Sequence, residues 1–269
     1  MRISLHDIGG QTLRVGVRRG NKGRPPLLLF NGIGANIELV EPFLDALDGS
    51  EAIIFDVPGV GGSPAPRLPY RPSTLARLSA RLLDVLGHAQ VDVLGVSWGG
   101  VLAQQFAFQQ ATRCRRLVLA ATSPGHLMVP GKPAVLLRMA TPRRYRDPDY
   151  MQRVAGDIYG GAFRGAPELV RTHMRHVRWS SDYGYYLQLV AGFGWTSLPW
   201  LRFLSQPTLV MAGTDDPIVP VVNSRILAKL IPLARLVTVD DGHLFLVTSA
   251  GPSAEIISEF LGRDQIVSS

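Results

Sequence analysis

The sequence has a single cysteine, Cys114, among its 269 residues. No disulfide can therefore form within the chain, and no cluster of cysteines can hold a metal ion. Long hydrophobic runs are also absent, since none approaches the roughly 18 apolar residues of a membrane span. The first residues, Met1 to Asp7, lack the apolar stretch of a signal peptide. We therefore expect a cytoplasmic protein without a transmembrane segment.

Acidic residues are scarce in one internal segment. The chain carries a net charge of +7, and residues 124–203 hold eleven basic side chains against five carboxylates. No motif for binding a DNA or RNA groove accompanies this excess, so we expect no nucleic-acid partner. One interpretation is a basic surface that meets an anionic interface or attracts an acidic product. The other is a solvated, arginine-rich face.

The chain does have a series of short, almost wholly apolar segments that alternate with helical patterns. Such segments are typical of strands buried on both faces of a parallel sheet, and they span residues 26–30, 52–56, 91–96, 116–121, 207–212 and 235–239. An earlier strand over 11–18 is expected to be antiparallel. Helices are expected over about 37–47, 74–86, 101–107, 223–230 and 249–261, with Ser73 or Thr74 capping the second. The pattern predicts an α/β protein with a mostly parallel sheet and helices on both faces.

The alternation stops between residues 124 and 203. This segment contains helical fragments, many glycines and prolines, no strong strand pattern and 12 of the 21 aromatic residues. We interpret it as a helical cap inserted into a core formed by residues 1–123 and 204–269. The polar tail, residues 264–269, is expected to fray.

One stretch joins a buried strand to an amphipathic helix through a serine. Gly95-Val96-Ser97-Trp98-Gly99 matches the G-x-S-x-G nucleophile elbow in the context that the motif requires. The turn strains the serine backbone so that its Oγ projects from the sheet, and the flanking glycines leave room for it. The helix N-terminus directs its positive end toward a developing oxyanion. Ser97 is therefore the candidate nucleophile, with a glycine-rich loop as the alternative.

A serine nucleophile needs a general base that is held by a third group. In this arrangement the acid and then the histidine follow the serine, each on a loop at the carboxyl end of a strand. The loop after 207–212 offers Asp215 and Asp216, whereas the loop after 116–121 has no carboxylate. Only one of the six histidines, His243, follows a late strand; the others are His6, His88, His126, His173 and His176.

Backbone N–H groups are the expected donors to a tetrahedral oxyanion. One belongs to Trp98, the residue after the nucleophile. The other comes from the first strand–helix loop, residues 31–34, where Ile33 is the best-placed donor. Residues 56–63 form a structural turn in our interpretation, because they lack the G-x-G-x-x-G pattern and the later acidic residue of a nucleotide site. We expect neither a cofactor nor a metal ion.

These motifs resemble the α/β-hydrolase superfamily and, more narrowly, its intracellular depolymerases of medium-chain-length poly(3-hydroxyalkanoates). Eight stretches over roughly residues 10–262 carry the resemblance. Four lie in the core, at 30–36, 55–63, 95–100 and 240–246, and four lie inside the segment interpreted as a cap, at 129–133, 142–145, 158–161 and 192–197. In this superfamily the spacing Gly-x-x-Asp-x-apolar-apolar-Pro selects Asp216 over Asp215.

The resemblance implies a triad of Ser97, Asp216 and His243. It also implies a serine esterase that cleaves a storage polyester to 3-hydroxy acids through an acyl-enzyme, in the cytoplasm and at the granule surface. The main alternative is a carboxylesterase or lactonase that acts on soluble medium-chain esters. A carbon–carbon bond hydrolase or a perhydrolase would use the same triad. The oligomeric state is not predicted.

Overall fold

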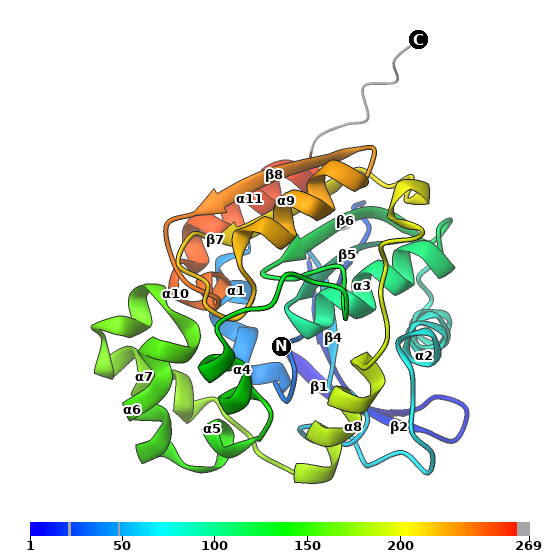
Figure 1. Ribbon diagram of the computed structural model, residues 1–269. Coiled ribbons are helices and arrows are strands. Elements are labelled where there is room, and N and C mark those ends of the chain that lie inside the picture. The colour runs from blue at the N-terminus through cyan, green and yellow to red at the C-terminus, as the bar shows by residue number, and fades with distance from the viewer. Residues whose placement is uncertain (21–22, 48, 263–269) are drawn as a thin grey trace.

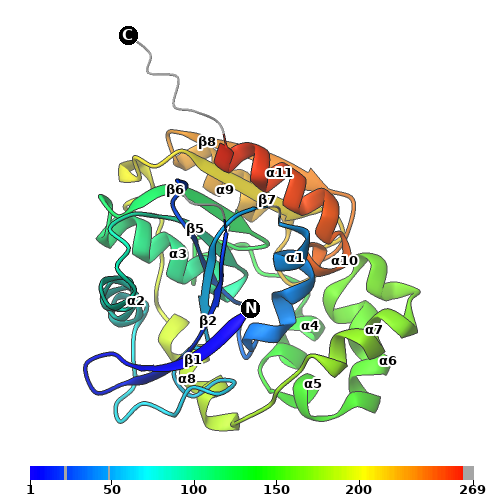
Figure 2. The ribbon, with the colours of Figure 1, turned by 180° about the vertical axis from the view of Figure 1, so that it is seen from behind.

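An eight-stranded sheet forms the centre of the protein (Figures 1 and 2). The computed structural model describes residues 1–20, 23–47 and 49–262. The strand order is β1-β2-β4-β3-β5-β6-β7-β8, with β1 Arg2–Asp7, β2 Thr12–Arg18, β3 Leu27–Phe30, β4 Ala52–Phe55, β5 Val91–Val96, β6 Cys114–Ala120, β7 Thr208–Gly213 and β8 Ala234–Val239. Strand β2 is antiparallel to β1 and β4, and all other neighbours are parallel. The predicted α/β class is confirmed.

Helices cover both faces of this sheet (Figure 2). One face packs against α2 (Pro72–Leu86), α3 (Trp98–Gln109) and α9 (Val221–Leu230). The other packs against α1 (Glu41–Ala46), α10 (Phe245–Thr248) and α11 (Ala250–Gly262). Strand β3 shows how the sequence produces this, because Leu28 and Phe30 enter the first core while Leu27 and Leu29 enter the second.

The chain between β6 and β7 is mostly helical. It contains α4 (Pro133–Met139), α5 (Arg143–Arg146), α6 (Pro148–Tyr159), α7 (Pro167–Arg175) and α8 (Asp182–Gly192), with 3₁₀ turns at Gly161–Arg164 and Leu201–Phe203. Helices α4 and α6 share a small apolar core with α7 and with Ile218 and Val219 of the main domain. Figure 1 shows α4 to α7 grouped together, with α8 set apart from them.

The structure differs from the sequence-based expectation at three places. Helix α2 begins at Pro72, and Arg71 precedes it without a side-chain cap. The expected cap at Ser73 or Thr74 is therefore wrong. The helix starts earlier because the fixed φ and the missing N–H of proline suit the first helical turn. Strand β1 was not expected, because it is an exposed edge strand without an apolar run. The helix expected over 37–47 starts as a 3₁₀ turn, Ile37–Val40. The tail 264–269 lies outside the described residues.

An ion network around the buried Asp56 carboxylate joins the sheet to the helical segment. Asp56 is fully buried and accepts hydrogen bonds from the backbone N–H groups of Ile37 and Gly62. Arg14 bridges Asp56, at 2.9 Å, and Glu38, at 2.6 Å. Glu38 also pairs with Arg178, which follows α7. The Asp56 carboxylate therefore fixes the turn after β4 through two backbone N–H groups and the Arg14 guanidinium.

We expect Glu38→Gln to destabilise the protein in a pH-dependent way. Partial burial opposes ionisation, but hydrogen bonds from Arg14 and Asn36 outweigh it and hold the pKa of Glu38 at about 2, against an ordinary value of 4.5. A lowered folded-state pKa stabilises the protein above pH 4.5, and this stability is lost as the pH falls toward 2. The substitution should therefore lower the free energy of unfolding by about 3 kcal/mol at pH 7 and by roughly half of that at pH 3.

Urea denaturation of both proteins at pH 7 and pH 3 measures this difference. Glu255→Gln, on an exposed position of α11, is the control and should show no such pH dependence. A loss of stability at Glu38 that is equal at both pH values would show that the charge of Glu38 contributes nothing.

Candidate active site

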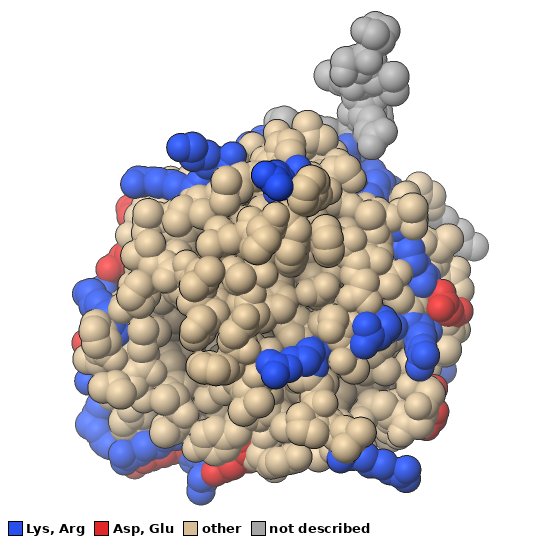
Figure 3. All heavy atoms as spheres, turned by 45° about the vertical axis from the view of Figure 1, so that its right-hand side comes forward, with Lys and Arg blue, Asp and Glu red and all other residues tan. Residues whose placement is uncertain are grey.

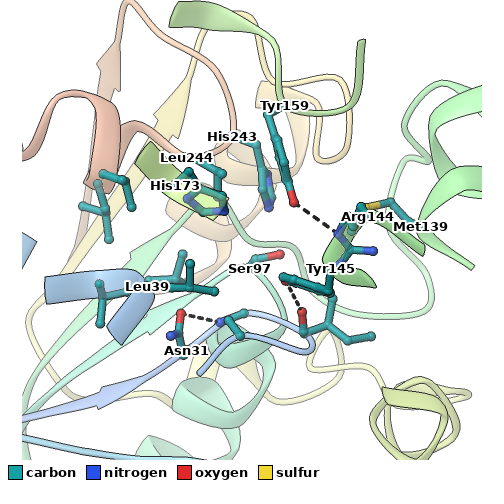
Figure 4. A pocket seen from close by; sticks show the side chains of 17 residues that line it. Asn31, Leu39, Ser97, Met139, Arg144, Tyr145, Tyr159, His173, His243 and Leu244 are labelled. Atoms are coloured by element: carbon teal, nitrogen blue, oxygen red, sulfur yellow. Dashed lines mark hydrogen bonds between the residues drawn. The ribbon is translucent and has the colours of Figure 1, made fainter. Parts of the chain in front are cut away.

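Ser97 lies at the sharp turn between β5 and α3. Its backbone has φ 54° and ψ −119°, and of the described non-glycine residues only Ala121 shares a positive φ. A Cβ on Gly99 would lie 2.1 Å from the Phe30 carbonyl oxygen, and one on Gly95 would lie 2.5 Å from the Gly99 carbonyl oxygen. Both positions therefore require glycine, and the close approach leaves the Ser97 side chain projecting from the end of β5 into a cavity (Figure 4).

His243 and Asp216 form a buried pair next to this turn. The Nδ1 atom of His243 lies 2.7 Å from Oδ2 of Asp216, and both side chains are almost fully buried. The other carboxylate oxygen, Oδ1, accepts hydrogen bonds from the N–H groups of Ile218 and Val219. Asp216 is thus fixed by its own loop and can orient the imidazole, so that Nε2 is the free ring nitrogen.

Asp215 has a different environment from its neighbour. Its exposed carboxylate pairs with Arg164 at 2.5 Å and accepts a hydrogen bond from the N–H of Gly161. These contacts lower the pKa of Asp215 to about 2, with the Arg164 hydrogen bond as the largest cause. Asp215 therefore connects the acid loop to the helical segment and does not contact His243. The structure thus brings Asp216, and not Asp215, to the histidine.

Ser97 and His243 line the same cavity (Figure 4). No hydrogen bond joins Ser97 Oγ to the His243 ring in this structure. Such catalytic hydrogen bonds are often long without substrate and tighten only when substrate is bound. The three residues therefore have the positions that a nucleophile, a base and an orienting acid require, within one buried site.

Two backbone N–H groups are free to act as oxyanion donors. The N–H groups of Ile33 and Trp98 donate to no acceptor among the described residues, and Ile33 and Trp98 both line the space around Ser97. The Ile33 carbonyl accepts a 2.7 Å hydrogen bond from the hydroxyl of Tyr145 (Figure 4). Gln188 accepts another from the N–H of Gly34. Side chains from α5 and α8 therefore fix the loop that would present the Ile33 donor.

The end of α6 is in direct contact with the histidine loop. The Tyr159 carbonyl accepts a 2.7 Å hydrogen bond from the N–H of His243, and the two rings are near parallel with centroids 6.4 Å apart. A Cβ on Gly160 would lie 1.9 Å from the Asp215 carbonyl oxygen, and one on Gly161 would lie 2.0 Å from Asp241 Oδ1. Both glycines also have positive φ. Only glycine allows α6 to approach the acid and histidine loops so closely.

Two cavities meet at Ser97. The inner cavity has a volume of about 50 Å³ and is lined by His243, Tyr159, His173 and Arg144 besides apolar residues. The outer cavity is open, has a volume of about 560 Å³ and is largely apolar, with walls that include Val101, Met128, Leu189 and Phe193. A substrate can therefore extend to both sides of the nucleophile.

The other histidines lie outside the Ser97–His243–Asp216 arrangement. His126 lines the outer cavity and His173 the inner one. His88 lies near Glu51 and His176 near the Thr172 carbonyl, and His6 contacts Ser4. No group of metal-ligating side chains occurs within the part of the chain that the structure describes.

Sequence reasoning missed three side chains that shape the site. Tyr145, Tyr159 and Arg144 all lie between β6 and β7, and Tyr145 and Tyr159 are far in sequence from the Ile33 and His243 backbone groups that they bind. The cluster of aromatic residues in this segment was visible in the sequence. It gave no indication of which rings line the cavity, because that depends on how short helices pack.

The protein-family model of the alpha/beta hydrolase fold matches residues 25–250 of the sequence, and this range includes Ser97, Asp216 and His243. The chain belongs to this family. A poly(3-hydroxyalkanoate) depolymerase from Ectopseudomonas oleovorans is 56% identical to it, over 96% of this chain and 92% of that protein. The resemblance to the poly(3-hydroxyalkanoate) depolymerases that the sequence motifs indicated is therefore confirmed.

Solved structures agree with this fold. An enol-lactonase from Burkholderia xenovorans LB400 superposes with a TM-score of 0.82 at 24% identity, covering 97% of this chain and 100% of its own. A hydrolase from Pseudomonas aeruginosa PA01 gives a TM-score of 0.81 at 26% identity, covering 97% of this chain and 98% of its own.

No described helix is long and apolar enough to cross a membrane.

Proposed function

We propose that this hydrolase depolymerises medium-chain-length poly(3-hydroxyalkanoates) to 3-hydroxy acids. The observation that carries the proposal is the 56% identity to a depolymerase over nearly the whole chain, together with a buried Asp216–His243 pair beside Ser97. The open apolar cavity at the nucleophile suits an aliphatic polyester. The proposed place of action is the cytoplasm, at the granule surface.

The proposed mechanism uses Ser97 as the nucleophile. Its Oγ attacks the ester carbonyl while His243 Nε2 takes the proton, and Asp216 holds the imidazole and stabilises the imidazolium. The N–H groups of Ile33 and Trp98 donate to the oxyanion. His243 then protonates the leaving alkoxide, and water hydrolyses the acyl-enzyme by the same steps in reverse order. No cofactor or metal ion is needed for this reaction.

Residues 124–203 act as a cap over the core, 1–123 and 204–269, in this proposal. Met139, Arg144, Tyr145 and Tyr159 from the cap line the inner cavity above Ser97. They exclude water from the reacting ester, which strengthens the hydrogen bonds to the oxyanion.

The mouth of the outer cavity is suited to a water-insoluble polymer. Exposed Phe193 lines this cavity, and four more exposed apolar residues directly precede or follow lining residues in the sequence: Leu127, Val129, Leu137 and Val190. Figure 3 shows a face of the molecule on which residues without a charge predominate, with a few basic side chains on it and the acidic side chains mostly near its outline. Apolar patches of this kind mark interaction surfaces. We propose that this surface rests on the polyester.

We expect the double variant Leu127→Ser, Leu137→Ser to bind polyester particles roughly 10-fold more weakly, because both leucines are largely exposed and would be buried against the polymer. Sedimentation of particles with the protein measures binding. Leu233→Ser, equally exposed but located before β8 at the opposite end of the strands, should bind normally. Equal binding by the native protein, the double variant and Leu233→Ser would contradict the docking surface.

The experiment that tests the function compares two substrates. A suspension of medium-chain polyester loses turbidity when it is hydrolysed, and p-nitrophenyl octanoate reports cleavage of a soluble ester. Clearing of the suspension with release of 3-hydroxy acids supports the depolymerase. Cleavage of the soluble ester alone would instead favour the carboxylesterase or lactonase alternative.

A further inference from the structure

Arg144 is an almost fully buried arginine in the wall of the inner cavity. Only 1% of its surface is exposed. Its Nε donates to the Tyr159 hydroxyl at 3.1 Å, and Nη1 donates to the Tyr185 hydroxyl at 2.6 Å. The guanidinium also lies over the ring of Tyr145, 4.5 Å from its centroid. Figure 4 shows it beside Tyr159, on the cavity that contains Ser97.

No carboxylate in the described part of the chain neutralises this charge. Six of the ten arginines in residues 124–203 pair with an aspartate or glutamate, and they are Arg138, Arg143, Arg146, Arg164, Arg171 and Arg178. Arg144 has only phenol and carbonyl oxygens as acceptors, and the cavity lining contains no acidic residue. A guanidinium stays charged in proteins, and a buried charge without a counter-charge is costly.

A second polar group in the cavity has no partner. His173 is 93% buried, and its Nδ1 makes no hydrogen bond within the described structure. Burial lowers the pKa of His173 to about 4, assisted by the charges of His176 and Arg144. The ring is therefore neutral at pH 7 and can donate one hydrogen bond without adding positive charge. The inner cavity thus offers a cation and a neutral polar group to an oxygen ligand.

The size of the inner cavity limits what this ligand can be. Its volume of about 50 Å³ holds about four water molecules, at 10–15 Å³ each. A carboxymethyl group has four non-hydrogen atoms and fits this space, whereas a whole medium-chain acid does not. The aliphatic chain would instead extend into the outer cavity of about 560 Å³, which begins at Ser97.

We propose that Arg144, with His173 as a neighbouring donor, binds the free carboxylate at the carboxyl end of the polyester chain. The inference rests on the proposed ester hydrolase function. Carbons 1 and 2 of the terminal unit occupy the inner cavity, and the ester joined to carbon 3 lies at Ser97. The Nη2 atom of Arg144, which donates to no acceptor among the described residues, forms a charge-assisted hydrogen bond to this carboxylate. The enzyme would then remove units one at a time from this end.

The reaction at this subsite transfers the rest of the polyester chain from O3 of the terminal unit to Ser97 Oγ. Ser97 Oγ forms a bond to the carbonyl carbon of the penultimate unit, and the bond from that carbon to O3 of the terminal unit breaks. O3 takes the proton from His243 and leaves as the hydroxyl of a free 3-hydroxy acid. The rest of the chain stays on Ser97 as an acyl-enzyme in the outer cavity until water hydrolyses it, which produces a new terminal carboxylate.

The first test uses the native protein. Inhibition of p-nitrophenyl octanoate hydrolysis is measured with 3-hydroxyoctanoate and with the uncharged 3-hydroxyoctanamide. We expect the acid to bind roughly 10- to 100-fold more tightly, as is typical of a charge-assisted hydrogen bond in a desolvated site. Calorimetry with Ser97→Ala repeats the comparison without catalysis. Equal affinities for acid and amide would overturn the proposal.

The second test uses a dimer of 3-hydroxyoctanoate with either a free carboxylate or a methyl ester at its end. The native protein should have the higher kcat/KM for the free acid, and Arg144→Met should reduce the ratio of the two values to about one. Arg144→Lys should restore part of the preference. Arg143→Met, an exposed neighbour paired with Asp147, is the matched control and should keep the native ratio.

The outcomes separate this inference from the proposed function. A free-acid preference that survives in Arg144→Met would overturn the subsite, even if the polymer is hydrolysed. A preference that depends on Arg144 would support the subsite, even if the polymer suspension never clears, in which case only the polymeric substrate would be wrong.

Discussion

Replacing Ser97 with alanine should lower kcat for ester hydrolysis by roughly 10⁵- to 10⁶-fold, the usual cost of removing a serine nucleophile. Ser97 supplies the only hydroxyl at the turn between β5 and α3, and it lies where both cavities meet. The free N–H groups of Ile33 and Trp98 would remain and would support a small residual rate. Both p-nitrophenyl octanoate and a medium-chain polyester suspension serve as substrates.

Alanine at position 97 must adopt the same strained backbone conformation as Ser97. A separate measurement therefore has to show that the variant is folded. The melting temperature of Ser97→Ala should stay within a few degrees of the native value. Rapid mixing of native protein with the octanoate ester should give a burst of p-nitrophenol that the variant lacks. Polymer clearing by the variant at the native rate would show that another group is the nucleophile.

Asp216→Asn should lower kcat by about 10⁴-fold, as expected when the orienting acid of such a triad is replaced. The asparagine oxygen can still accept from the N–H groups of Ile218 and Val219. Its NH₂ group must then face Nδ1 of His243, which forces the proton onto Nε2. That tautomer cannot accept a proton from Ser97.

Asp215→Asn is the matched control, because it is the same chemical change one residue earlier. Asp215 is exposed and pairs with Arg164, so its replacement should change kcat by less than a few fold. The two variants are compared on the same soluble ester over pH 5–9. A larger loss at Asp215 than at Asp216 would contradict the assignment of the acid.

The sheet and the positions of the triad candidates were predictable from sequence for a physical reason. Buried parallel strands require nearly continuous apolar runs, and the loops that follow them must lie at one edge of the sheet. Ser97, Asp216 and His243 each follow such a run, so their proximity depends on topology alone. Glycines 95 and 99 identified the elbow because no other residue fits there.

The contacts of residues 124–203 could not be predicted in this way. Arg144 and Arg143 are neighbours of the same residue type, yet Arg144 is buried in the wall of the inner cavity and Arg143 is exposed. The difference comes from the packing of α5 against α6 and α8, which no local pattern determines. The basic excess of this segment is partly balanced from outside it, because Arg164 pairs with Asp215 and Arg178 pairs with Glu38.

The contact between Gly160, Gly161 and the loops of Asp215 and His243 has a consequence for protein engineering. Exchanging residues 124–203 for the matching segment of a relative would also exchange the carbonyl of Tyr159, which accepts a hydrogen bond from the His243 backbone N–H. A chimera joined at residues 124 and 203 would keep Ser97, Asp216 and His243 in its sequence and could still misplace the His243 ring. A donor segment is therefore suitable when it has a Tyr-Gly-Gly turn at the position of residues 159–161. A graft that ends before residue 158 keeps the native turn and is the safer design.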